Sequence, residues 1–127
     1  MGPFAVGWTG EDVQAVLDRA DPRELLYVPI VIGMNAADCE REWVENICLQ
    51  LAEHPDFNVR GNAILGLGHV ARTCRMLDIQ AAVPVIAAAL LDEHEFVRGH
   101  AVSAAQDLRS YLGIDVPGMN GDATRGP

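Results

Sequence analysis

The sequence contains no lysine, and its nine basic residues, all of them arginine, are outnumbered by 18 acidic residues. The formal net charge of −9 gives a surface that repels a phosphate backbone, so we expect no nucleic-acid partner. The same negative field would attract and orient a basic protein. Aromatic residues make up only 6% of the chain while alanine and leucine are abundant, which favours helices over a β-sandwich.

Cysteine is also scarce: Cys39, Cys48 and Cys74 form an odd number without the spacing of a disulfide framework. We predict buried, reduced thiols of a cytoplasmic protein. No basic segment followed by an apolar stretch opens the chain, so no secretory signal is expected. The longest apolar stretch, at about 81–91, is too short to span a bilayer. These features predict a soluble, intracellular protein with one domain.

Capping residues and apolar spacing predict a series of helices, with Thr9, Asp21, Asp38 and Asp78 as N-caps. Pro29 is expected to bend the second of them, and a strand through 27–32 remains the alternative there. The predicted helices lie at about 9–19, 22–34, 38–53, 57–73 and 78–91, and a last one follows the acidic turn 92–95 and ends at 112.

Gly113 is expected to stop the last helix. The residues after it, 114–127, hold no apolar periodicity and much glycine. We therefore predict a disordered tail over 114–127.

A short motif occurs twice, with Val59 and Val97 38 positions apart. Both copies contain Val-Arg-Gly-x-Ala, and each follows an apolar helix and a short acidic break. This is the pattern of one helix–turn–helix unit repeated. The motif residues are Val59, Arg60 and Ala63 in the first copy and Val97, Arg98 and Ala101 in the second.

These residues resemble the HEAT-repeat family, whose pattern is Asp-x-x-Val-Arg followed by an apolar helix with small residues. Asp56, Val59, Arg60 and Ala63 match it, whereas the second copy has His94 in place of the aspartate. In the physical interpretation of the motif, valine and alanine seat the second helix of a hairpin against the first. The arginine can reach an aspartate or a carbonyl at a turn, so we expect its role to be structural.

The resemblance implies an all-α fold, a short α-solenoid of about three antiparallel helical hairpins. It would form a single domain over 1–113. The expected units are a degenerate leading unit at 9–34 and clearer repeats at 38–73 and 78–112.

One segment of the sequence resembles a nucleotide-cofactor motif. Gly66-Leu67-Gly68-His69-Val70-Ala71 fits the loose dinucleotide-binding fingerprint G-x-G-x-x-A, but no acidic residue follows about 20 positions later to hold a ribose. We interpret Gly61, Gly66 and Gly68 as positions where two helices approach closely. A nucleotide-dependent activity at this segment is the alternative.

Other catalytic and metal patterns are missing. His94 and His100 do not share a helix face, and no Cys-x-x-Cys or His-x-x-x-His pair occurs. Ser103 and Ser110 lack the context of a nucleophile elbow. We therefore predict no catalytic residues, no metal and no cofactor.

The acidic residues supply the candidate binding surface. Asp38, Glu42 and Glu45 lie along one side of a predicted helix, and the others belong to turns that stacking would bring together. The predicted partner-binding residues are Asp38, Glu42, Glu45, Asp56, Asp92, Glu93 and Glu95.

Charge, size and predicted fold together indicate a non-catalytic protein-binding module. In these respects the chain is similar to bacterial immunity proteins, which neutralise basic toxin domains, often nucleases, by covering their active sites. The alternative is a HEAT-like scaffold or regulatory subunit that docks on an enzyme or forms a homo-oligomer. Both predict a protein partner and neither needs nucleic acid or a membrane.

Overall fold

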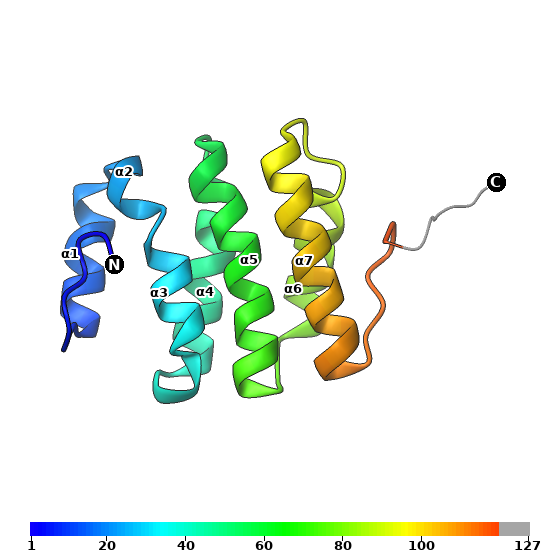
Figure 1. The fold of residues 1–127 in the computed structure, drawn as a ribbon, viewed down its shortest axis with the longest axis horizontal. Coiled ribbons are helices and arrows are strands. Elements are labelled where there is room, and N and C mark those ends of the chain that lie inside the picture. The colour runs from blue at the N-terminus through cyan, green and yellow to red at the C-terminus, as the bar shows by residue number, and fades with distance from the viewer. Residues whose placement is uncertain (120–127) are drawn as a thin grey trace.

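The helices of the protein stack side by side in a short row (Figure 1), as described for residues 1–119 by a computed structural model. No strand occurs among these residues, which confirms the predicted all-α class and short solenoid; the strand alternative at 27–32 is wrong. The elements are α1 (Gly10–Arg19), α2 (Pro22–Leu25), α3 (Val28–Met34), the 3-10 helix η1 (Ala36–Asp38), α4 (Arg41–Leu51), α5 (Phe57–Cys74), α6 (Ile79–Ala89) and α7 (Glu95–Leu112).

Several helices begin and end at the residues that the sequence predicted. The Thr9 side chain accepts a hydrogen bond from the Asp12 N–H, and the Asp12 carboxylate accepts one from the Thr9 N–H at 2.7 Å, so a capping box starts α1. Asp21 and Asp78 accept backbone N–H groups at the starts of α2 and α6. Gly113, with φ 67°, ends α7 in the left-handed conformation.

The segment predicted as one bent helix at 22–34 forms two separate helices. α2 ends at Leu25, and α3 begins at Val28 with Pro29 in its first turn. A proline at this place needs no partner for its missing N–H. The prediction that Pro29 bends a continuous helix is therefore wrong, because the proline lies at the start of a new one.

α4 begins later than the sequence predicted. Asp38 ends η1, and the N-cap position of α4 is Glu40. Cys39, between them, is extended with φ −112° and ψ 170°, which separates the two helices. The predicted cap at Asp38 is wrong, and Cys39 lies outside the helix that carries Cys48.

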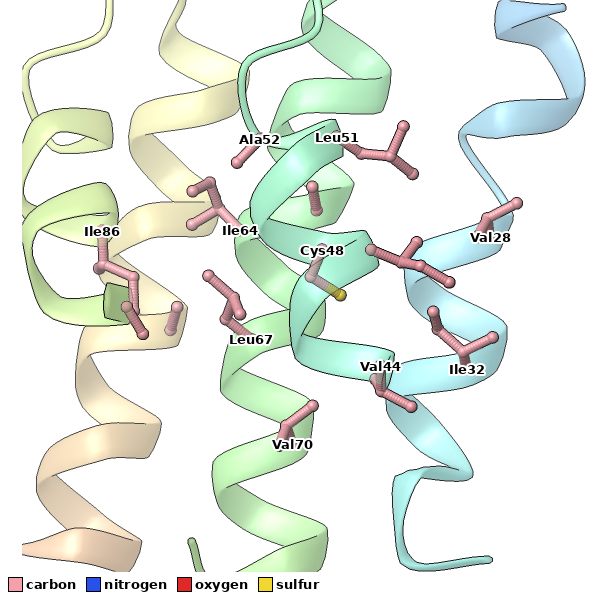
Figure 2. Close-up of a cluster of buried hydrophobic side chains, with 14 of the residues drawn as sticks. Val28, Ile32, Val44, Cys48, Leu51, Ala52, Ile64, Leu67, Val70 and Ile86 are labelled. Atoms are coloured by element: carbon pink, nitrogen blue, oxygen red, sulfur yellow. The ribbon is translucent and has the colours of Figure 1, made fainter. Parts of the chain in front are cut away.

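α5 occupies the centre of the stack. It packs between α3 and α7 in one layer, and α4 and α6 lie behind it in the view of Figure 1. The interior in Figure 2 is almost entirely aliphatic, and burial raises the pKa of the Cys48 thiol to about 12, so this thiol is a protonated core group. Labelled core residues are Val28, Ile32, Val44, Cys48, Leu51, Ala52, Ile64, Leu67, Val70 and Ile86.

Non-helical segments before α1 and after α7 pack on the stack. In the N-terminal arm, Phe4 is buried and meets Trp8 edge to face, with ring centroids 6.0 Å apart. After α7, the first residues of the predicted tail, 114–119, lie against the core, and Val116 is only 3% exposed. The rest of that predicted tail, 120–127, lies outside the described residues. Both segments therefore add apolar side chains to the core.

Candidate functional site

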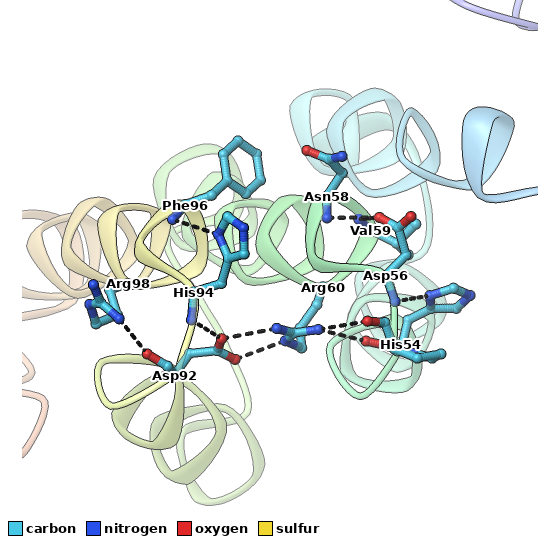
Figure 3. A network of polar contacts seen from close by, with 10 residues as sticks. His54, Asp56, Asn58, Val59, Arg60, Asp92, His94, Phe96 and Arg98 are labelled. Carbon is cyan, nitrogen blue, oxygen red and sulfur yellow. Dashed lines mark hydrogen bonds and ion pairs between the residues drawn. The ribbon is translucent and has the colours of Figure 1, made fainter.

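Arg60, in the first copy of the repeat motif, joins two successive turns (Figure 3). Its Nε and Nη2 donate to the two carboxylate oxygens of Asp92 at 2.8 and 2.9 Å. Its Nη1 donates to the carbonyls of His54 and Pro55 at 3.2 and 3.1 Å. The guanidinium holds the pKa of Asp92 below its ordinary value, so the pair is ionised at neutral pH.

The second copy of the motif makes a weaker contact. Arg98 is exposed and donates to the backbone carbonyl of Asp92 at 2.8 Å. The apolar motif residues behave alike in both copies. Val59, Ala63, Val97 and Ala101 are all fully buried.

Aromatic rings also join the two turns, which the sequence reasoning missed. Phe57 and His94 stack with ring centroids 3.6 Å apart, and Phe96 meets Phe57 edge to face at 5.7 Å. A Cβ on Gly61 would lie 2.7 Å from the Phe96 ring, so a residue larger than glycine would displace this ring. His94 is also the N-cap of α7, since its Nδ1 accepts the Phe96 N–H at 3.2 Å.

The predicted acidic residues lie at opposite ends of the helices. Asp38 and Glu42 flank the start of α4, whereas the 92–95 turn lies at the end where α5 and α7 begin (Figure 1). Because α4 and α5 are antiparallel, these two groups cannot form one face. We call the exposed carboxylates Asp38, Glu40 and Glu42 the acidic end, and Glu93 with Glu95 the turn end.

Three residues of the predicted set are engaged within the chain. Glu45 is 3% exposed, forms an ion pair with Arg41, and accepts a hydrogen bond from the Asp78 N–H at 3.3 Å. Its place on an exposed acidic face is therefore a wrong prediction. Asp56 caps α5 by accepting the N–H groups of residues 58 and 59, and Asp92 binds Arg60.

A cavity of about 560 Å³ lies at the acidic end, between the start of α1 and the turn from η1 to α4. Both tryptophans of the chain border it, and the sequence reasoning did not join them because they are far apart in the chain. Its lining residues are Gly7, Trp8, Thr9, Gly10, Asn35, Asp38, Cys39, Glu40 and Trp43. We call it the tryptophan cavity.

The segment that resembles a nucleotide fingerprint lies in the middle of α5. A Cβ on Gly66 would lie 2.9 Å from the Cys48 Sγ and 2.9 Å from the Pro29 carbonyl oxygen. A Cβ on Gly68 would lie 2.8 Å from the Asp107 carboxylate. These glycines face packed helices and not a strand-to-helix turn, so the segment has no place for a phosphate.

His69, in the same segment, should make folding sensitive to acid. Burial lowers its pKa from 6.5 to about 4, and the Arg72 charge adds to the effect. The unfolded chain binds this proton near pH 6.5 and the folded one only near pH 4, so stability falls as the pH drops through this window. As the pH is lowered from 7 to 4, the urea midpoint of unfolding should fall less steeply in the His69→Gln variant than in the wild type. An equal dependence of the midpoint on pH in both proteins would contradict this role of His69.

Among residues 1–119, no group of three or more histidine, cysteine, aspartate or glutamate side chains could hold a metal ion. No helix in this part of the chain is long and apolar enough to cross a membrane. All three cysteines are free thiols, but only Cys48 is buried. The predicted burial of Cys39 and Cys74 is wrong, since both are half-buried.

Antiparallel helix pairs joined by equivalent turns, with each pair packed on the next, define an α-solenoid. A sequence profile of HEAT repeats matches residues 44–115, more than half of the chain. The chain belongs to the HEAT-repeat family. No curated protein and no solved structure matches it. HEAT repeats generally serve as protein-interaction scaffolds and are typically non-catalytic.

Proposed function

We propose that the protein is a non-catalytic HEAT-repeat module that docks on a basic surface of another protein through its acidic end. The supporting observation is that Asp38, Glu40 and Glu42 are exposed beside the tryptophan cavity. Arg41, the arginine within this segment, pairs with the buried Glu45. Its approach to Glu42, at 4.0 Å, is exposed and weak.

The turn end supports binding less well. Asp92 already holds Arg60, and the Arg98 guanidinium donates to the Asp92 carbonyl, which brings a second positive charge to this turn. The field there is partly balanced within the chain. The acidic end keeps its charge for a partner.

Charge reversal at the two ends tests this proposal. The Asp38→Lys/Glu42→Lys variant should lose the partner that co-purifies with the tagged wild-type protein from its own host. The Glu93→Lys/Glu95→Lys variant, with the same change in net charge, should retain it. Raising the salt concentration should weaken capture by the wild type. Equal loss in both variants, or no partner with the wild type, would refute docking through the acidic end.

A narrower role extends the proposal: neutralisation of a basic toxin domain, as bacterial immunity proteins do. The net charge of −9 on 127 residues favours it. The captured partner decides between the two roles. A basic nuclease whose activity the chain blocks would establish neutralisation, and an enzyme that stays active in the complex would favour a scaffold or regulatory subunit.

A further inference from the structure

The tryptophan cavity has two aromatic walls. Trp8 and Trp43 are both half-buried, so each indole is fixed by packing and still keeps part of its surface open. Gly10 brings the start of α1 close to this wall, since a Cβ there would lie 3.9 Å from the Trp43 ring. Indole faces carry negative electrostatic potential and attract cations.

The polar wall of the cavity is negative. Asp38 and Glu40 line it, and none of its nine lining residues is basic. Burial raises the pKa of the Cys39 thiol, and the Asp38 charge raises it further, so this group stays protonated. The N-termini of α1 and α4 lie here too, but each carries roughly half a positive charge, less than one carboxylate.

The fold leaves the polar groups of this wall available. Glu40 holds the N-cap position of α4 without a side-chain hydrogen bond to the helix, whereas Thr9, Asp56 and Asp78 all make one. The Asn35 amide nitrogen donates to the Val31 carbonyl at 2.7 Å, which leaves the amide oxygen as an acceptor. Carboxylate and amide oxygens therefore lie on the same wall as the indoles.

From this combination we infer that the tryptophan cavity binds the guanidinium group of an arginine on the partner protein. A guanidinium is flat, stacks on indole faces and offers five N–H donors to carboxylate and amide oxygens. A lysine ammonium is a compact, strongly hydrated charge and uses aromatic walls less well. The inference rests on the proposed docking function and names the partner residue that the acidic end takes.

An apolar pocket of about 220 Å³ adjoins the cavity and shares Trp8 and Asn35 with it. Phe4, Val31 and Met34 also line this pocket, and Met34 is 51% exposed. An apolar side chain next to the arginine would bury this surface. The preferred segment therefore places a bulky apolar residue beside the arginine.

The two indole N–H signals of the ¹⁵N-labelled full chain report on this cavity directly. Titration with the peptide acetyl-Gly-Arg-Leu-Gly-amide should shift both signals saturably. The matched peptide with citrulline in place of arginine keeps the shape without the charge and should bind at least about tenfold more weakly. A lysine peptide should also bind more weakly than the arginine peptide.

Isosteric variants locate the site. Asp38→Asn/Glu40→Gln should weaken binding of the arginine peptide at least about tenfold, and Glu93→Gln/Glu95→Gln should leave it unchanged. Three outcomes would overturn the inference. The arginine peptide would leave the indole signals unshifted, the citrulline or lysine peptide would bind equally well, or the Asp38→Asn/Glu40→Gln variant would keep full affinity. If capture of the cellular partner still depends on Asp38 and Glu42 in that case, the docking function stands and only the arginine assignment fails.

Discussion

Replacement of Gly66 by alanine is expected to lower the free energy of unfolding by about 2–3 kcal/mol, although alanine is the better helix former. The added Cβ would lie 2.9 Å from the Cys48 Sγ and 2.9 Å from the Pro29 carbonyl oxygen. The second of these is backbone, so α3 would have to move away from α5. Urea unfolding followed by far-ultraviolet circular dichroism measures the loss.

Gly99 provides the matched control. It lies in the interior of α7, and a Cβ there would meet no atom within 4 Å. The Gly99→Ala variant should therefore gain about 0.5–1 kcal/mol from helix propensity alone. A gain of the same size at Gly66 would show that close helix contact is not the reason for glycine at that position.

Replacement of Arg60 by methionine is expected to lower the free energy of unfolding by about 2–3 kcal/mol. Asp92, whose side chain is only 14% exposed, would lose its counter-ion, and the carbonyls of His54 and Pro55 would lose their donor. The Arg60 pair holds the pKa of Asp92 below its ordinary 3.8, so it stabilises the fold above that pH and less below it. The difference between variant and wild type in urea unfolding should therefore narrow in acid.

Arg98 occupies the same motif position in the second copy and provides the control. Its side chain is exposed, and its guanidinium donates to one backbone carbonyl. The Arg98→Met variant should change stability by no more than about 0.5 kcal/mol. Equal losses at the two arginines would contradict the view that the bridge from Arg60 to the next turn is the stabilising contact.

The starts of α1, α2 and α6 and the repeat could be predicted because their signals lie within a few residues of one another. Thr9 and Asp12 form a capping box over three positions, and Asp78 caps α6 in the same local way. The recurrence of Val-Arg-Gly-x-Ala needed only one comparison within the chain. Such features depend on local geometry, which a sequence states directly.

The errors at Asp38 and Pro29 are local, because η1 and the break before α3 interrupt patterns that resembled continuous helices. The two errors that affect the candidate site concern contacts between distant segments. Glu45 looked exposed because it lies opposite the apolar stripe of its helix, but the segment before α6 covers it and Asp78 donates to it. The tryptophan cavity escaped notice because Trp8 precedes α1 and Trp43 lies on α4. Only the packing of one helix on another brings such residues together.

The open space beside Gly99 also affects whether a further repeat could be added after α7. In the first copy of the motif, Gly61 makes room for the Phe96 ring of the following unit. Gly99 holds the same motif position in the second copy, and that space is open. If the unit were duplicated and inserted after α7, the residue equivalent to Phe96 could place its ring in the open space beside Gly99. The 114–119 segment would then have to pack on the last helix of the added unit. Gly99 itself would not need to be substituted.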